Sequence, residues 1–257
     1  MDETYKNMIR QSLKMTGMSD EQIEATIAMQ QTAMQQAAEA MNAAATADSY
    51  FEFATEPTVN TSYQWAIACG ADLIHLRGDV INDLTSGIDG DICREILSEQ
   101  WGIDTRQQFI EMAESLKARR HSAVYETLDK KTTQGFAEEK QNLTNALRFF
   151  KSQKWITAIP DMTAWDLGRL VHVTRFALDA NLIDRPTALA NLRDIAQGIK
   201  KHYTSWQQLS TGYQFGRAVW GGLDECQELR DGMEQLLTEK DSPWVTLPFD
   251  MPLDFNE

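Results

Sequence analysis

The chain is poor in residues that cross-link a fold or anchor it in a membrane. Its 257 residues include three cysteines and six prolines, and no apolar run approaches the roughly 18 residues of a membrane-spanning helix. The cysteines, Cys69, Cys93 and Cys226, are too few and too scattered for a disulfide framework or a structural zinc site. We therefore expect no membrane span, and a fold that depends on an apolar core.

Basic residues are scarce as well. Lys and Arg number 24 against 38 Asp and Glu, which gives a net charge of −14 and argues against broad non-specific nucleic-acid binding. The first 22 residues show no basic segment followed by an apolar one, so no secretory signal is expected. A cytoplasmic location with reduced thiols is the default prediction.

The charge is distributed unevenly along the chain. Residues 1–57, 58–105 and 155–257 each carry a net charge of −6, whereas residues 106–154 carry +4. A short charge run usually forms a solvated helix end and loop, and contact with an anion or nucleic acid is the alternative. We call residues 106–154 the basic island, and it is centred on Lys117, Arg119, Arg120, Lys130 and Lys131.

Apolar residues recur with helical spacing through most of the chain, and only the short segment WITAIP at 155–160 suggests extended structure. The pattern predicts an all-α protein: a compact multi-helix domain with an N-terminal helical arm and an extended, proline-rich C-terminal tail. We place the arm at residues 1–57, the domain at 58–241 and the tail at 242–257. Because the tail is rich in aromatic residues, we expect it to dock on the domain.

The arm is predicted to contain one long helix. Ser19 and Gln22 form a capping box ahead of Ile23 and Ile27, and no Pro or Gly interrupts residues 19–56. The methionines of this helix fit either an adaptable contact surface or ordinary core packing. The arm is also where a homo-oligomer could form.

Three further helices are placed by their apolar faces. The first begins near Thr61 and presents Trp65, Cys69, Leu73, Leu76 and Val80. The second ends at Gly102, in the C′ position, and presents Ile92, Cys93, Ile96, Leu97 and Trp101. The third presents Phe109, Ile110, Ala113 and Leu116.

The common catalytic signatures are absent. No GxSxG, P-loop, GxGxxG or HExxH motif occurs, and no cofactor or metal is predicted. The turn that starts at Asp83 fails as an EF-hand because its twelfth position is Arg94 rather than an acid. Asp72, His75 and Asp79 have the spacing to face one metal ion, but they also form the polar stripe of a helix, so a solvated face is preferred.

Residues 161–180 combine an apolar circumference with ionisable side chains. A helix that is apolar on most faces is usually buried, and a buried charge must be paired. Asp166 and Arg169 are spaced to pair on their own helix. Two interpretations stay open: a structural ion pair with a core histidine, or a ligand cleft lined by Arg169, His172 and Arg175.

A second helix carries a related set of side chains. Tyr213, Gly216, Arg217 and Trp220 fall on one of its faces, and Gly216 permits close approach of another backbone. Aromatic and guanidinium groups arranged in this way can bind a ligand or a peptide. They can equally pack against residues 161–180.

Four short segments occur in a familiar order: WGIDTRQQF at 101–109, AWDLGRL at 164–170, TSW at 204–206 and YQFGRAVW at 213–220. Over residues 61–222 they resemble the bacterial domain-of-unknown-function family 1266. The resemblance implies a compact helical domain with no established activity. The family pattern falls on Trp101, Gly102, Ile103, Arg106, Trp165, Asp166, Arg169, Arg175, Ser205, Trp206, Tyr213, Gly216, Arg217 and Trp220.

Two turns depart from the family pattern. The chain has Arg119-Arg120-His121 where the family often has Gly-His-Arg, and Asn181-Leu182 where the family favours Gly-Tyr. A functional site of the family that requires the first turn is therefore not expected to be carried over to this chain unchanged.

Two functional hypotheses from different classes follow. The first is a non-enzymatic protein that binds a basic protein partner, as immunity or antitoxin-type proteins do, because the chain is acidic and lacks catalytic signatures. The second is a small-ligand-binding protein or enzyme with a cleft on the helix at 161–180. The candidate cleft residues are Trp165, Asp166, Arg169, His172, Arg175, Trp206, Tyr213, Arg217 and Trp220.

Overall fold

The chain divides into two units, residues 1–50 and 51–257. In the first unit, residues 22–28 form a helix that buries Ile23 and Ile27, in agreement with the predicted apolar face. The remainder of the predicted arm helix up to residue 48 lies outside the described residues. The computed structural model describes residues 22–28, 49–125, 127–128, 137–152 and 161–256.

The predicted arm helix does not continue to residue 57, because residues 49–60 contain no helix. Hydrogen bonds to a distant loop hold this segment instead. The amide of Ala54 donates to Asn82 Oδ1 (2.8 Å), and the amide of Thr58 donates to Asp83 Oδ1 (2.7 Å). These tertiary contacts outweigh the local helix propensity of the alanine-rich sequence before them.

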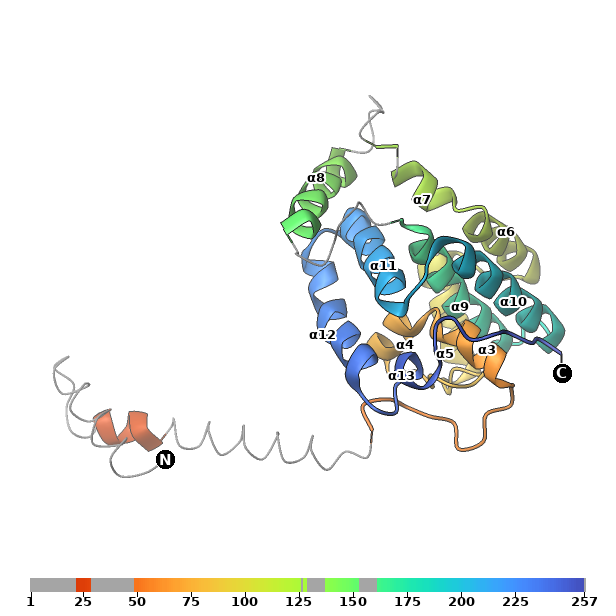
Figure 1. Ribbon diagram of the computed structural model, residues 1–257, viewed down its shortest axis with the longest axis horizontal. Coiled ribbons are helices and arrows are strands. Elements are labelled where there is room, and N and C mark those ends of the chain that lie inside the picture. The colour runs from red at the N-terminus through yellow and green to blue at the C-terminus, as the bar shows by residue number, and fades with distance from the viewer. Residues whose placement is uncertain (1–21, 29–48, 126, 129–136, 153–160, 257) are drawn as a thin grey trace. The chain divides into compact units, whose positions relative to one another are not determined.

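The described part of the second unit contains helices and no strand, which confirms the all-α prediction (Figure 1). None of the described helices is long and apolar enough to cross a membrane. The helices are α3 (Thr61–Ala68), α4 (Ala71–Arg77), α5 (Gly90–Trp101), α6 (Arg106–Lys117), α7 (Arg120–Tyr125), α8 (Ala137–Ser152), α9 (Thr163–Asp179), α10 (Arg185–His202), α11 (Trp206–Gly221), α12 (Asp224–Thr238) and α13 (Pro243–Thr246).

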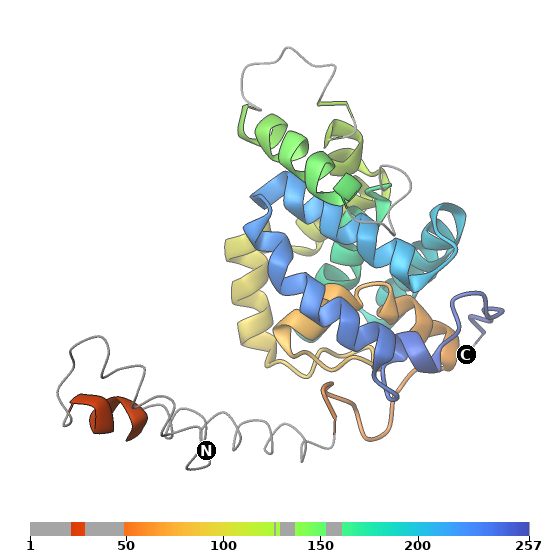
Figure 2. The same ribbon diagram turned by 60° about the vertical axis from the view of Figure 1, so that its left-hand side comes forward.

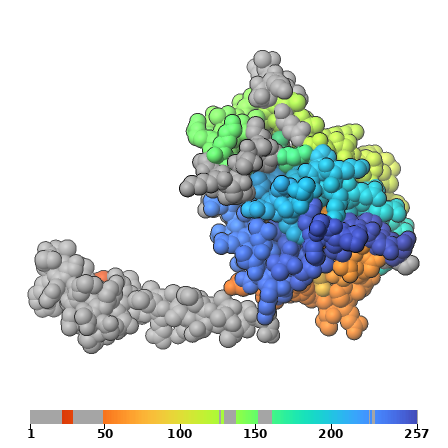
Figure 3. All heavy atoms as spheres, viewed as in Figure 1, coloured from red at the N-terminus to blue at the C-terminus, as the bar shows by residue number. Residues whose placement is uncertain are grey.

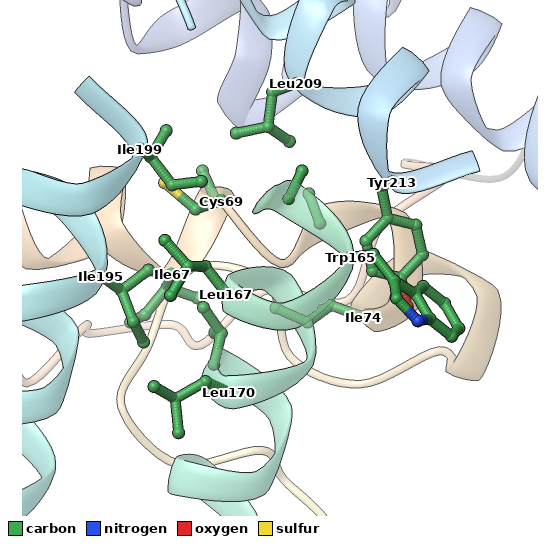
Figure 4. Close-up of a cluster of buried hydrophobic side chains, with 14 of the residues drawn as sticks. Ile67, Cys69, Ile74, Trp165, Leu167, Leu170, Ile195, Ile199, Leu209 and Tyr213 are labelled. Carbon is green, nitrogen blue, oxygen red and sulfur yellow. The ribbon is translucent and has the colours of Figure 1, made fainter. Parts of the chain in front are cut away.

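Helix α9 lies at the centre of the second unit. It packs against α4, α5, α6, α7, α10 and α11, and both ribbon views show it enclosed by its neighbours (Figures 1 and 2). Its Leu167 and Leu170 lie in a cluster with Ile67 of α3 and Ile195 of α10 (Figure 4). Each large aliphatic side chain buried there stabilises the fold by about 1.5–3 kcal/mol.

The helix predicted from Thr61 through Val80 is two helices, α3 and α4, separated at Gly70. The chain passes α9 so closely at this point that a Cβ on Gly70 would lie 2.8 Å from the Cβ of Val171. Helix α4 then ends at Gly78, whose φ of 70° lies in the left-handed region.

Three apolar residues of the predicted buried faces are exposed instead. Leu76, Ile92 and Ile110 have exposed fractions of 40%, 50% and 39%. Helices α4, α5 and α6 each bury a narrow stripe, as with Cys93 and Leu97 of α5. Helical spacing therefore located these faces but overestimated their width.

Helix boundaries follow from local capping groups. Gly102 ends α5 with φ 65°, as predicted, and Thr105 begins α6 through a reciprocal capping box with Gln108. Ser205 caps α11 through the amide of Gln208. The segments WGIDTRQQF and TSW are therefore, in the first place, helix start and stop signals.

The C-terminal segment docks on the second unit, as predicted (Figure 3). The indole of Trp206 donates to the carbonyl of Leu247 (2.8 Å), and that of Trp244 donates to Ala68 (2.9 Å). The prediction of a wholly extended tail is wrong at α13, where Ser242 caps a single helical turn.

The two turns that depart from the family pattern keep a backbone that suits glycine. Arg119 and Asn181 have φ values of 54° and 56°, and they are the described non-glycine residues with positive φ. Each stands at a position where the resemblance described above leads us to expect Gly. The turns therefore retain the left-handed conformation, at a steric cost that glycine does not carry.

We expect Asn181→Gly to raise the free energy of unfolding by up to about 1 kcal/mol, because glycine adopts the left-handed conformation without a Cβ clash. Asn181→Ala should lower it by a similar amount. Urea unfolding measures both, with Asn145→Gly inside α8 as the control, since it should cost about 0.5 kcal/mol. Destabilisation by Asn181→Gly would show that the asparagine side chain, and not the backbone, governs this turn.

Candidate functional site

A cavity of about 450 Å³ lies against α9. This volume is within the range of roughly 300–1,000 Å³ that is typical of small-molecule sites. No acidic side chain of the described residues lines it. The lining consists of Leu73, Arg77, Gln100, Trp101, Met112, His121, Trp165, Arg169, His172, Tyr213, Arg217 and Trp220.

Two glycines allow α9 and α11 to form one wall of this cavity. A Cβ on Gly216 would lie 2.4 Å from the Cβ of Trp165, and a Cβ on Gly168 would lie 3.0 Å from the ring of Tyr213. Each helix thus makes room for an aromatic residue of the other, and Trp165 and Tyr213 lie side by side (Figure 4). A close approach was predicted at Gly216, but the group that comes close is the side chain of Trp165 and not another backbone.

Arg169 lies on the aromatic side of the cavity. Its guanidinium carbon is 4.1 Å from the ring centre of Trp165 and 5.8 Å from that of Trp101. Its Nε donates to the carbonyl of Trp165 (2.7 Å). Burial lowers the pKa of Arg169 and the neighbouring carboxylate of Asp166 raises it again, so the group keeps its charge at neutral pH.

Asp166 is fully buried behind the cavity wall. It accepts hydrogen bonds from Arg169 (2.7 Å) and from both the amide (2.9 Å) and the hydroxyl (2.8 Å) of Ser122. Burial raises the pKa of Asp166, but the contact with His121, the charge of Arg169 and the Ser122 hydrogen bonds outweigh it and hold the pKa below its ordinary value. The predicted Asp166–Arg169 pair is confirmed. Through its hydrogen bonds with Ser122, Asp166 also connects α9 to α7.

His172 is buried at the cavity, with an exposed fraction of 2%. Its Nδ1 lies 3.8 Å from Oδ2 of Asp79 and makes no hydrogen bond to the described residues. Burial and the charges of Arg77 and Arg175 lower the pKa of His172 to about 3, so the imidazole is neutral at physiological pH. The prediction of a satisfied core histidine is therefore wrong at Nδ1.

Arg175 and Trp206 do not line the cavity. The buried guanidinium of Arg175 donates to the carbonyls of Val80, Leu84 (3.4 Å) and Thr85 (2.7 Å), so it holds the loop between α4 and α5. Trp206 stacks on Trp244 with ring centres 5.8 Å apart, under the C-terminal segment. Both residues stabilise the fold.

The polar stripe of Asp72, His75 and Asp79 is not a solvated face. Asp72 and Asp79 are buried, and Asp72 accepts a hydrogen bond from the hydroxyl of Ser210 (2.6 Å). Burial raises the pKa of Asp72 to about 7, against the lowering effect of that hydrogen bond. Within the described ranges, no cluster of three metal-ligating side chains occurs.

In a comparison with known protein families, residues 96–249 of the chain match DUF1266, a family of proteins of unknown function. The chain belongs to this family. The match starts later than the expected residue 61 and continues to residue 249, so half of the docked C-terminal segment, residues 242–249, lies within the DUF1266 region. Searches of curated proteins and of solved structures gave no match.

The DUF1266 region brings together six of the nine predicted site residues. Helices α9 and α11 supply all six, and Asp166 lies directly behind them. Sequence reasoning missed Trp101 and His121 as cavity residues, although Trp101 stands in a family motif. It also missed Arg77, which precedes the family match and has no local signal. The six are Trp165, Arg169, His172, Tyr213, Arg217 and Trp220.

Two of the three described residues on which the basic island is centred are paired with acids, and the third, Arg120, is exposed. Lys117 lies 3.3 Å from Glu114 and 3.1 Å from Asp194, and Arg119 lies 3.4 Å from Asp161. This favours the surface interpretation of the island over an anion site. Lys130 and Lys131 lie outside the described residues.

We expect Asp166→Asn to lower the free energy of unfolding by about 3–5 kcal/mol, because it leaves Arg169 partly buried without its counter-charge. The pKa of Asp166 is depressed in the folded state, so its contribution is present above the unfolded pKa and is lost as the pH falls. The difference between wild type and variant in urea should therefore shrink below about pH 4.

Asp194→Asn is the matched control, because it removes a carboxylate whose side chain is about half exposed and paired with Lys117. Such surface pairs contribute about 0–1 kcal/mol. Equal losses for the two variants would contradict the assignment of Asp166 as the structural centre of the site.

Proposed function

We propose that the cavity on α9 binds a small anionic molecule with a flat ring. The observation that carries the proposal is the composition of the lining: three arginines, three tryptophans and no carboxylate among the described residues, in a chain with a net charge of −14. Guanidinium groups recognise carboxylates and phosphates through paired hydrogen bonds. Indole rings bind flat groups by stacking.

The charge balance around the cavity supports an anion. Arg77 has one carboxylate near it, with its Nε 3.8 Å from Oδ2 of Asp79, and Arg169 is paired with Asp166. Arg217 is the third cation, and its guanidinium carbon lies 5.5 Å from the ring centre of Trp220. All three guanidinium groups belong to residues that line the cavity, whereas Asp79 and Asp166 do not line it.

Two aromatic residues give the site an accessible entrance. Trp220 is 51% exposed although it lines the cavity, and its ring centre lies 6.0 Å from that of the buried Trp165. A flat ligand group can therefore contact Trp220 at the surface and Trp165 inside. In the proposed mode of binding, the ring of the ligand lies against these two indoles, one on α9 and one near the end of α11.

The hypothesis of a basic protein partner rests on the net charge and on the absence of catalytic signatures, and it stays a prediction. A homo-oligomer formed through the N-terminal arm stays a prediction too, since most of that arm lies outside the described residues. The cavity is the more specific feature because it combines volume, charge and aromatic surface in one place.

Calorimetric titration of the full chain at low ionic strength with 2-naphthoate tests the proposal. We expect binding at one site, and binding of the neutral 2-naphthamide that is weaker by about tenfold or more, because a charged hydrogen bond contributes about 1.5–3 kcal/mol. Arg217→Gln should weaken 2-naphthoate binding to a similar extent.

Arg193→Gln is the matched control, since it removes an exposed arginine of α10 that does not line the cavity. Trp220→Ala should lower the affinity for both 2-naphthoate and 2-naphthamide, because it removes the stacking surface without removing charge. Equal affinity for the acid and the amide, or equal losses in Arg193→Gln and Arg217→Gln, would overturn the proposal, as would the absence of binding.

A further inference from the structure

One side of the cavity is formed by a neutral imidazole rather than by a cation. His172 projects from α9, and its ring lies between Phe176 and Trp101, with ring centres 4.0 Å and 6.3 Å away. It is buried and lines the cavity. Its Nδ1 makes no hydrogen bond to any of the described residues.

The two ring nitrogens of His172 face different surroundings. Nδ1 is buried and lies 3.8 Å from Oδ2 of Asp79, a residue that does not line the cavity. Because His172 itself lines the cavity, the ring edge that carries Nε2 is the edge that we assign to the cavity side. A carboxylate favours the tautomer that turns an N–H toward it and disfavours the one that turns a lone pair toward it.

Arg77 and Arg175 stabilise the charged form of Asp79. Burial raises the pKa of Asp79 above its ordinary value, and the charges of Arg175 and of Arg77, whose Nε lies 3.8 Å from Oδ2, oppose that rise and favour the carboxylate. The same two arginines keep His172 neutral. The proton of the imidazole is therefore expected on Nδ1.

We propose that Nε2 of His172 is a hydrogen-bond acceptor facing the cavity, so that the ligand carries an N–H or O–H donor in addition to its anionic group and flat ring. This inference rests on the proposed function of the cavity. The arginines and tryptophans supply donors and ring contacts, and an arginine cannot accept a hydrogen bond. Nε2 supplies an acceptor that distinguishes one flat anion from another.

The tautomer can be measured without a ligand. Nitrogen NMR of the full chain with labelled histidine reports which imidazole nitrogen carries the proton, and His172→Leu assigns the signal among the four histidines. We expect the proton on Nδ1 of His172 and a bare Nε2 at neutral pH. A proton on Nε2, or an imidazolium, would overturn the inference.

Ligand discrimination is the second measurement. Calorimetry with the 5-, 6- and 7-hydroxy derivatives of 2-naphthoate should find at least one that binds the wild type about two- to tenfold more tightly than 2-naphthoate, the contribution of one neutral hydrogen bond. Its methyl ether, which lacks the donor, should lose that advantage. His172→Leu should abolish the advantage while 2-naphthoate still binds, and His75→Leu, which lies outside the cavity lining, should preserve it.

The outcomes separate the two proposals. If 2-naphthoate binds but no hydroxyl isomer gains affinity, or if the gain survives in His172→Leu, the acceptor role is wrong and the proposed anion site stands. If 2-naphthoate does not bind the wild type, the anion site and the ligand class inferred from it both fail. Should His172→Leu not fold, single replacements of the other three histidines assign the His172 signal by elimination, and the tautomer and the methyl ether comparison still decide the question.

Discussion

Asp166 is a fully buried carboxylate, and much of the arrangement around the cavity follows from the need to pair it. Leaving such a charge unpaired would cost several kcal/mol, so the fold brings Arg169 from the same helix and both donors of Ser122 from α7. Once Arg169 is held, it lies against the rings of Trp165 and Trp101. The same carboxylate thus fixes α7, orients an arginine and places His121 beside the cavity.

A steric constraint complements this electrostatic one. In both helices that form the main wall, a glycine precedes an arginine: Gly168 before Arg169 and Gly216 before Arg217. Each glycine accommodates an aromatic side chain of the opposite helix. The next residue lies about 100° further round the helix, and in both cases it lines the cavity. Two family motifs therefore encode one interlocked pair of helices, with their arginines turned to a common space.

Sequence periodicity was sufficient for what is local. It predicted an all-helical domain, the end of α5 at Gly102, and cavity residues on α9 and α11 that share a helix face. It failed where contacts with distant segments of the chain determine how a side chain is placed. Arg175 follows His172 by one turn, but its long side chain reaches the carbonyls of a loop some 90 residues away. Asp72 resembled a solvated residue because its partner Ser210 lies on another helix, and Arg77 reaches the cavity without any motif.

The acidic composition of the chain and the cationic lining of the cavity are compatible because they act over different distances. At physiological ionic strength, charges on an exposed surface are screened within about 8 Å, whereas partly buried charges are screened much less. The excess of carboxylates on the surface therefore has little effect on a ligand inside the cavity. A ligand inside the cavity experiences mainly Arg77, Arg169 and Arg217, with Asp166 and Asp79 behind them. Net charge alone thus points to a basic partner, whereas the local arrangement favours an anion.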